Sequence, residues 1–364
     1  MIILLKILLG LVATALALPV VVVLTFLVYA VIRYGPVIGR IFEVRPVFLP
    51  LRVSPAETGE TVRFTTEDGL KLEGSYLRRR RDDRVGILVF CHEYLSDRWS
   101  CLPYLDHLRD EGYDIFTFDF RNHGASESSS TYSPLQWATE YEVRDLRAAL
   151  GYLRGRDDHD PAGFGLFGVS RGGSTALVVS SEERDVWGVV TDGAFPTRGT
   201  MTAYILRWAE IYVRSPRFLA LMPRWVYTFL GRVSRRRSER RLNCRFPDIE
   251  TAVRGISPRP WLMVHGERDA YIGPEIARAL FAEGGEPKEF WLVEDAKHNR
   301  CRECQPEAYS IRVVDFFQRY APRRPLEPAA KPTEAPELST FANQRALTLA
   351  TPRLVPDVTA PVTS

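Results

Sequence analysis

A serine between glycines is the residue of this chain whose surroundings point most clearly to chemistry. It lies in the segment GVSRG at 168–172, after the apolar run 164–169 and before a stretch rich in small residues. This is the G-x-S-x-G pattern, in which a sharp turn from strand to helix lifts the serine hydroxyl clear of the sheet. Side chains at Gly168 and Gly172 would collide across that turn, and the helix N-terminus favours developing negative charge. The pattern predicts that Ser170 is a nucleophile.

An acid and a base for this serine occur later in the chain. A serine hydroxyl is a poor nucleophile until a base takes its proton. Asp269 falls on the loop after the apolar run 260–266, and His298 comes just after the next apolar run. In such a site His298 would take the proton of Ser170 and return it to the leaving group, while Asp269 would hold the imidazole in the required tautomer.

Strand and helix patterns alternate over most of the chain. Short apolar runs bounded by glycine or charge are typical of strands buried on both faces of a parallel sheet. We expect strands within 62–77 (two, around a turn at 67–69), 85–90, 113–120, 164–169, 186–193, 260–266 and 289–295, and the clearest helix within 135–155. The alternation predicts one α/β domain with a mainly parallel sheet, placed at residues 61–321.

Taken together, these motifs resemble the α/β-hydrolase superfamily of serine hydrolases. The resemblance spans 62–320 and rests on the serine turn and four further segments: VFCHEY at 89–94, FDFRNHGAS at 118–126, HGERD at 265–269 and AKHN at 296–299. It implies the α/β-hydrolase fold and a triad of Ser170, Asp269 and His298. It implies no metal or organic cofactor, because the triad and an oxyanion hole supply the chemistry.

One loop departs from the family's pattern. After the third strand the family commonly has His-Gly, whereas this chain has His92-Glu93-Tyr94. The expected oxyanion donors are the backbone N–H groups of Arg171 and Tyr94. Because the donors are main chain, Glu93 need not abolish the hole, yet it could lengthen the geometry or add an unwelcome negative charge. Losing one donor would cost about 3 kcal/mol of transition-state stabilisation.

The other titratable residues near these strand ends are expected to be structural. His92, His123 and His265 lie beside strand ends and turns, where hydrogen bonding is a commoner role than catalysis. Asp192, at the end of the strand after the serine helix, is a position from which some family members draw their acid. Asp269 has the better loop context, and we expect it to be the acid.

Composition argues against nucleic-acid binding, a disulfide scaffold and a structural metal site. The 364 residues are 45% hydrophobic and 26% charged, which suffices for a sizeable core, and a net charge of +3 is too small to argue for nucleic acid. Five cysteines are too few for a disulfide scaffold. Cys301 and Cys304 form a single CxxC, which lacks the second ligand pair of a structural zinc site, so we expect no metal.

The N-terminus predicts a membrane anchor at residues 1–35, followed by a linker at 36–60. Residues 7–32 carry no charge and exceed the roughly 20 residues that span a bilayer as a helix. A signal peptide cleaved after 15–17 is the alternative, but apolar residues continue well beyond that site. The arginines after the span favour a cytoplasmic domain by a margin of about one charge.

Two further segments stand outside the alternation. Residues 196–257 contain aromatic-rich helical patterns and fit a helical lid insertion, with ordinary packing helices as the alternative. Five arginines within 235–241 suit either a solvated face or anionic headgroups. Residues 322–364 are rich in Pro, Ala and Thr, which predicts a disordered tail.

These observations favour a membrane-anchored hydrolase that cleaves a carboxylic ester, thioester or amide through an acyl-enzyme on Ser170. Tethering and the aromatic insertion favour a small-molecule or lipid-like acyl substrate. A peptidase or acyltransferase with the same triad is the first alternative. A catalytically silent binding protein, suggested by Glu93, is the second, and a membrane scaffold that works through its tail is the third.

Overall fold

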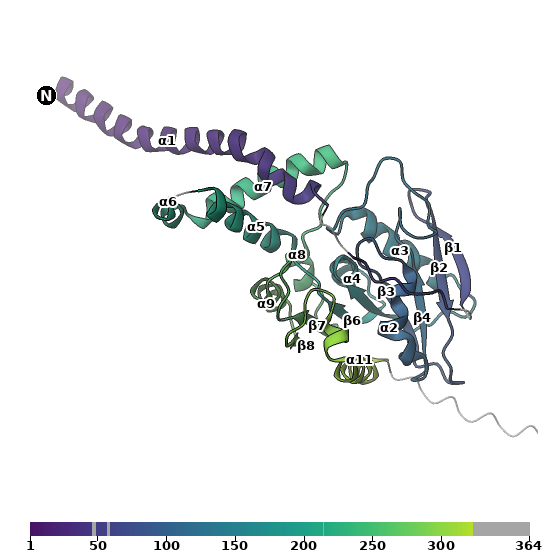
Figure 1. Ribbon diagram of the computed structural model, residues 1–364. Coiled ribbons are helices and arrows are strands. Elements are labelled where there is room, and N and C mark those ends of the chain that lie inside the picture. Colours follow the sequence, from purple (N-terminus) through teal and green to yellow (C-terminus); the bar gives the residue numbers. More distant parts are fainter. Residues whose placement is uncertain (46–48, 57–58, 214, 323–364) are drawn as a thin grey trace, which may run out of the picture. The chain divides into compact units, whose positions relative to one another are not determined.

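An eight-stranded sheet forms the centre of the structure, a computed structural model that describes residues 1–45, 49–56, 59–213 and 215–322 (Figure 1). The spatial order is β1-β2-β4-β3-β5-β6-β7-β8. The strands are β1 Glu60–Thr65, β2 Lys71–Leu77, β3 Gly86–Cys91, β4 Tyr113–Phe118, β5 Phe164–Val169, β6 Val186–Asp192, β7 Trp261–Gly266 and β8 Lys288–Val293. Each lies within about two residues of the expected run.

The sheet is parallel from β4 across to β8, and only the β1–β2 hairpin runs antiparallel to its neighbours. The predicted fold class, an α/β fold with a mainly parallel sheet, is confirmed. The parallel strands end at one edge, so the loops after β3, β5, β7 and β8 meet there.

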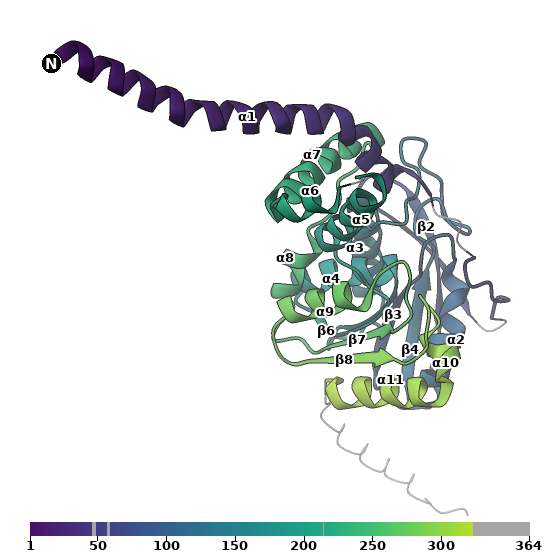
Figure 2. The same ribbon diagram turned by 60° about the vertical axis from the view of Figure 1, so that its left-hand side comes forward.

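Helices cover both faces of the sheet, and the side chains of each strand alternate between them. In β3, Ile87 and Val89 pack on one face while Leu88 and Phe90 pack on the other. The first face is covered by α3 Glu140–Arg154, α4 Arg171–Glu182, α8 Ile249–Arg254 and α9 Pro274–Glu283; the second by α2 Cys101–Leu105 and α11 Pro306–Tyr320 (Figure 2). This is why the central strands show as continuous apolar runs.

The segment between β6 and β7 is mainly helical in its described residues and contains no strand there. It contains α5 Thr197–Tyr212, α6 Pro216–Leu221 and α7 Arg224–Leu242 before α8. These helices contribute Met201, Ile205, Val226 and Leu230 to a third core cluster, which also contains the buried side chains of α1. The insertion is therefore packed against the N-terminal helix.

The N-terminal helix α1 runs without interruption from Ile2 to Glu43. Residues 1–25 are exposed, and the helix has an uncharged stretch with mean hydropathy 2.8, so by length and composition it could cross a membrane. Figures 1 and 2 show the N-terminal part of α1 lying clear of the sheet. Residues 36–43, expected to be linker, are instead helical.

Tertiary packing explains why the helix continues past the apolar segment. Gly35 and Gly39 face Ser234 and Ser238 of α7, whose hydroxyls donate to the glycine carbonyls at 3.5 and 3.4 Å. Small residues spaced four apart on both helices let the backbones approach closely. The contact stabilises a helical turn that the local sequence, with Pro36, would not indicate.

The C-terminal end of α1 is fixed by the loop before α3. Trp137 Nε1 and Gln136 Nε2 both donate to Ile41 O at 3.2 Å, so this carbonyl in the last turn of the helix gains two donors. The Phe42 ring is fully buried, with ring centroids 5.1 Å from Trp137 and 4.6 Å from Phe246. Of the predicted tail, residues 323–364 lie outside the described residues.

We expect Phe42→Ala to destabilise the protein by about 3–5 kcal/mol, because it removes a buried aromatic ring and leaves a cavity. Ile32→Ala, on the exposed side of the same helix, is the matched control and should change stability by less than about 0.5 kcal/mol. Thermal unfolding in detergent measures both. Equal, small effects would mean that the second half of α1 is not part of the core.

Candidate active site

Ser170 lies at the turn between β5 and α4, in a strained backbone conformation with φ 51° and ψ −116°. The turn is possible because the flanking positions are glycines. A Cβ at Gly168 would come 2.6 Å from the carbonyl oxygen of Gly172, and a Cβ at Gly172 would come 2.2 Å from that of Cys91. The structure therefore has the elbow geometry that the G-x-S-x-G pattern predicts.

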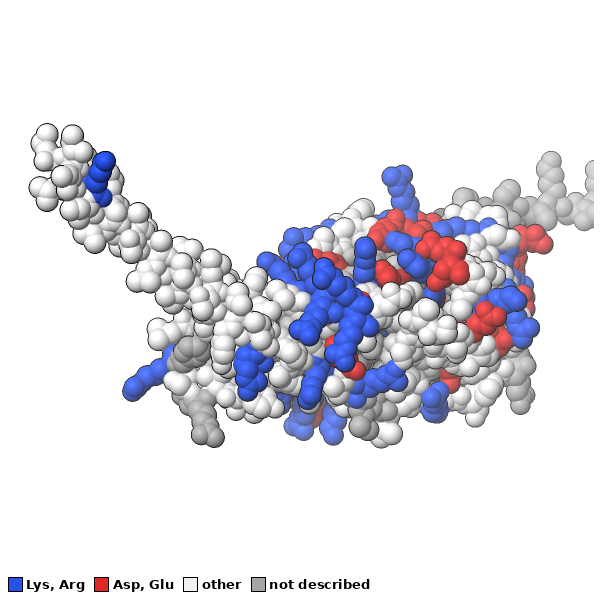
Figure 3. All heavy atoms as spheres, turned by 90° about the horizontal axis from the view of Figure 1, so that it is seen from above, with Lys and Arg blue, Asp and Glu red and all other residues white. Residues whose placement is uncertain are grey.

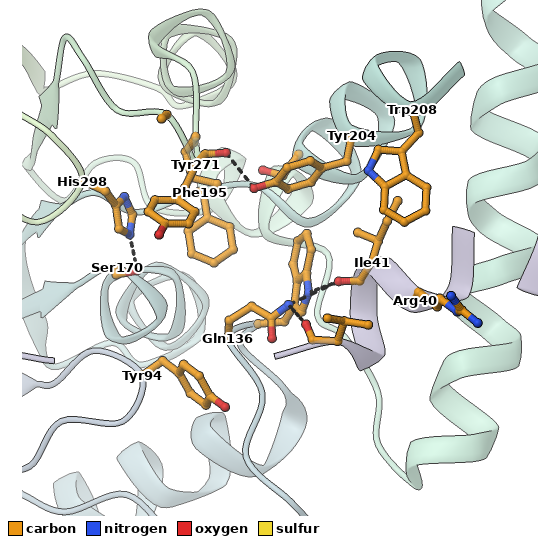
Figure 4. Close-up of a pocket in the computed structure, with 15 residues that line it drawn as sticks. Arg40, Ile41, Tyr94, Gln136, Ser170, Phe195, Tyr204, Trp208, Tyr271 and His298 are labelled. Atoms are coloured by element: carbon orange, nitrogen blue, oxygen red, sulfur yellow. Dashed lines mark hydrogen bonds between the residues drawn. The ribbon is translucent and has the colours of Figure 1, made fainter. Parts of the chain in front are cut away.

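Ser170, His298 and Asp269 form one chain of hydrogen bonds. Ser170 Oγ lies 2.8 Å from His298 Nε2 (Figure 4). His298 Nδ1 lies 2.5 Å from Asp269 Oδ2. The residues come from the loops after β5, β8 and β7, which end at the same sheet edge. The structure thus brings together the three residues that the sequence singled out.

Backbone groups fix the orientation and charge of the acid. Asp269 Oδ1 accepts hydrogen bonds from the N–H groups of Tyr271 and Ile272, both at 2.9 Å. Burial raises the pKa of Asp269, but the hydrogen bond from His298 and nearby positive charge outweigh it, so the pKa lies below its usual value. Asp269 is therefore a carboxylate at neutral pH. It holds the proton of His298 on Nδ1 and leaves Nε2 to accept from Ser170.

The alternative acid, Asp192, faces away from this chain of hydrogen bonds. Its Oδ2 accepts from the Tyr309 hydroxyl at 2.9 Å, and the Cys301 thiol also donates to it. Complete burial raises the pKa of Asp192 to about 6. The carboxylate that contacts His298 is therefore that of Asp269, as expected.

The proposed oxyanion donors lie at the ends of two neighbouring strands. Arg171 is the first residue of α4, where a backbone N–H has no helical acceptor. Tyr94 lies on the loop after β3 and lines the cavity at Ser170. Among the described residues, neither N–H has a protein acceptor. Both groups are available to a substrate oxygen.

The Glu93 side chain is turned away from the site. It is only 2% exposed, and its carboxylate lies 3.3 Å from the N–H of Leu51 and 3.5 Å from the Ser100 hydroxyl. Burial raises the pKa of Glu93, which reduces its tendency to carry charge. The Glu93 carboxylate therefore does not add negative charge to the oxyanion hole, as the sequence suggested it could. It binds the segment before β1 instead.

The Arg171 side chain has a structural role that sequence reasoning missed. The guanidinium is fully buried, contacts Glu142 Oε1 at 3.4 Å and His123 Nε2 at 3.3 Å, and lies over the Tyr94 ring. It thereby ties the start of α4 to the Tyr94 loop and to α3. A charged residue inside the glycine turn is the one signal that could have indicated it.

The nearby histidines are structural, as expected. His92 Nδ1 donates to Glu93 O at 2.7 Å, and His92 Nε2 accepts from Phe120 N at 3.1 Å. His265 lies 2.9 Å from Ile272 O and supports the loop that holds Asp269. No three His, Cys, Asp or Glu side chains gather as a metal site would require anywhere in the described residues.

Comparisons with known proteins agree with this fold. The family model of the alpha/beta hydrolase fold matches residues 86–245. An esterase of Pyrococcus furiosus superposes with a TM-score of 0.56 at 23% identity, covering 77% of this chain and 98% of its own. The α/β hydrolase GrgF of a Penicillium species gives 0.54 at 19%, over 72% and 99%. The chain has the α/β-hydrolase fold.

Two curated relatives of this α/β hydrolase illustrate the range of similarity. The uncharacterized protein YfhR of Escherichia coli K12 is 22% identical over 266 residues, 71% of this chain and 81% of YfhR. The thiohydrolase aneE of Aspergillus aculeatus is 33% identical over 123 residues, 33% of this chain and 37% of its own. The match to the α/β-hydrolase family model, together with the esterase neighbour, supports hydrolase activity in general.

An apolar cavity of about 370 Å³ opens beside Ser170 and His298. Aromatic side chains dominate its walls: Tyr94, Trp137, Phe195, Tyr204, Trp208 and Tyr271 (Figure 4). Arg40, Ile41 and Val44, at the end of α1, complete it. The sequence did not reveal that the N-terminal helix of this α/β hydrolase forms part of the pocket.

We expect Asp269→Asn to lower kcat about 10⁴-fold, because an amide cannot hold the histidine tautomer or stabilise its charged form. Asp192→Asn keeps an acceptor for the Tyr309 hydroxyl and should lower kcat far less. Hydrolysis of a chromogenic short-chain ester by the two variants, with thermal unfolding to confirm folding, measures the difference. A larger loss in Asp192→Asn would assign the acid to Asp192.

Proposed function

We propose that the protein is a membrane-anchored serine hydrolase that cleaves a carboxylic ester, thioester or amide of an apolar acyl group. The observation that carries the proposal is the hydrogen-bond chain from Ser170 Oγ through His298 to Asp269. This chain lies at an apolar cavity and beside two free backbone N–H groups. Nucleophile, base, orienting acid and oxyanion donors are the parts that acyl transfer needs.

The first half-reaction forms an acyl-enzyme. Ser170 Oγ attacks the substrate carbonyl carbon while its proton passes to His298 Nε2. The carbonyl oxygen becomes an oxyanion that accepts hydrogen bonds from the N–H groups of Tyr94 and Arg171. The bond to the leaving group then breaks, and His298 Nε2 returns the proton to the leaving alkoxide, thiolate or amine.

The second half-reaction restores the enzyme. A water molecule attacks the acyl carbonyl carbon, and His298 Nε2 takes one of its protons. The bond from the carbonyl carbon to Ser170 Oγ breaks, Ser170 recovers the proton, and the free acid leaves. Asp269 remains ionised throughout and stabilises His298 each time it is charged.

The nature of the cavity supports an apolar acyl group. A volume of about 370 Å³ lies within the range of small-ligand sites, which typically measure roughly 300–1,000 Å³. Its aromatic walls offer contact area with few polar partners. An esterase among the structural neighbours and a thiohydrolase among the relatives support both oxygen and sulfur esters as substrates.

The packing of α1 joins its second half, which lies beyond the leader cleavage site considered at 15–17, to the folded domain. Ala30, Ile38 and Phe42 are buried in the core cluster shared with the insertion, and Ile41 lines the cavity. The folded domain therefore needs the second half of this helix. The position of the Glu93 carboxylate weighs against a catalytically silent protein, since the oxyanion donors stay accessible.

Labelling with a fluorescent phosphonate that captures activated serines tests the proposal. We expect the native protein to be labelled and Ser170→Ala to remain unlabelled. Ser180→Ala, in the same helix α4, is the matched control, because this buried hydroxyl has no hydrogen-bond partner among the described residues. It should be labelled like the native protein. Labelling of Ser170→Ala, or no labelling of a folded native protein, would contradict the proposal.

A further inference from the structure

A second apolar cavity, of about 450 Å³, lies between the second half of α1 and the insertion. On the α1 side its walls include Phe26, Ala30 and Val37; on the insertion side they include Ile205, Ala209 and Val226. We call this cavity the α1–α5 groove. It is formed by an N-terminal helix and an insertion that are about 200 residues apart in sequence, and the α/β-hydrolase fold alone does not predict it.

The groove adjoins the cavity at Ser170. Arg40 and Trp208 line both. In Figure 4 these two side chains lie at the opposite end of the catalytic cavity from Ser170 and His298. An extended apolar ligand could therefore occupy both cavities at once, with its reactive group at Ser170.

The other end of the groove reaches the candidate membrane span. Its walls begin at Phe26, where α1 leaves the exposed stretch 1–25, and end at Arg40. The helical rise over that interval is about 21 Å. Tyr29, Arg33 and Tyr34 also line it, and aromatic and basic residues of this kind collect at membrane–water interfaces.

The tip of the insertion exposes apolar side chains beside α1. Ile211 and Tyr212, at the end of α5, are 69% and 67% exposed, and Leu221, at the end of α6, is 81% exposed. Exposed apolar clusters are unusual on soluble domains and mark contact with lipid or partners. Since these residues lie next to a membrane-spanning candidate, lipid is the partner they favour.

Basic side chains of α7 indicate where along α1 the lipid headgroups would lie. Arg236, Arg237 and Arg240 lie at helical spacing on one face of α7 and, with Val31 of α1, line a third cavity. Figure 3 shows Lys and Arg side chains gathered around the end of α1 that joins the domain. Cations at this position attract the anionic surface of a bilayer. If the headgroups lie beside Val31, Phe26 lies among the acyl chains of the bilayer.

We propose that the α1–α5 groove admits the acyl chain of a bilayer lipid and leads its carbonyl group to Ser170. This inference rests on the proposed hydrolase function and names its substrate class: long-chain acyl esters or thioesters resident in the membrane. The chain stays in contact with apolar side chains from the bilayer to the site, so the lipid avoids transfer through water. The anchor helix is then part of the substrate site.

Photo-crosslinking tests the groove without requiring catalysis. The full-length protein in phosphatidylcholine vesicles is illuminated with a long-chain fatty acid that carries a diazirine on its chain. We expect crosslinks on the α5 segment 205–213, reduced several-fold in Ala209→Trp, whose indole would fill the groove. Arg207→Trp, on the exposed side of α5, is the matched control and should crosslink like the native protein. Crosslinks confined to residues 7–25, or unaffected by Ala209→Trp, would overturn the proposal.

Kinetics separate this inference from the proposed function. We expect Ala209→Trp to lower the ratio of kcat/KM for a palmitoyl ester to that for a butyryl ester by at least about tenfold, while Arg207→Trp leaves the ratio unchanged. An equal loss for both esters would reject the groove and leave the hydrolase standing. If the native protein cleaves neither ester and Ser170 takes no phosphonate, the proposed function fails, and the crosslinks still decide whether the groove binds acyl chains.

Discussion

The close approach of two backbones at Gly172 is the constraint on which the rest of the site depends. The start of α4 presses against the end of β3 so tightly that a Cβ at Gly172 would meet the carbonyl oxygen of Cys91 at 2.2 Å. This contact forces Ser170 out of ordinary backbone geometry, and the surrounding packing must hold that strain. It also brings the N–H of Arg171 beside the loop that carries Tyr94. His298, after β8, then contacts the Ser170 hydroxyl, and Asp269, after β7, contacts His298.

A second close contact joins the candidate membrane-spanning helix to the same site. Gly35 and Gly39 let α7 approach α1, and the end of α1 then forms a wall of the cavity beside Ser170. A membrane-spanning helix that is also a pocket wall would connect the membrane directly to substrate binding. The second half of α1 therefore belongs to the folded domain.

The central fold and the meeting of Ser170, Asp269 and His298 at one point were predictable from the sequence because their signals are local. Buried parallel strands appear as short apolar runs, and Asp269 and His298 follow such runs directly. The continuation of α1 to Glu43, the pocket role of Ile41 and the buried position of the Arg171 side chain were not predictable. Each depends on a contact with a segment far away in the chain, as in the pairing of Gly35 with Ser234. The direction of the Glu93 side chain depends likewise on Leu51, in a segment without a recognisable pattern.

A structure of the protein after reaction with a long-chain alkyl phosphonate tests the central claim most directly. The phosphorus atom stands in for the carbonyl carbon of the tetrahedral intermediate, and its free oxygen for the oxyanion. The account predicts a covalent bond to Ser170 Oγ, with the free oxygen about 2.7–3.1 Å from the N–H groups of Tyr94 and Arg171. The alkyl chain should run past Trp208 toward α1. A phosphonate attached elsewhere, or an oxygen turned away from both N–H groups, would contradict the account.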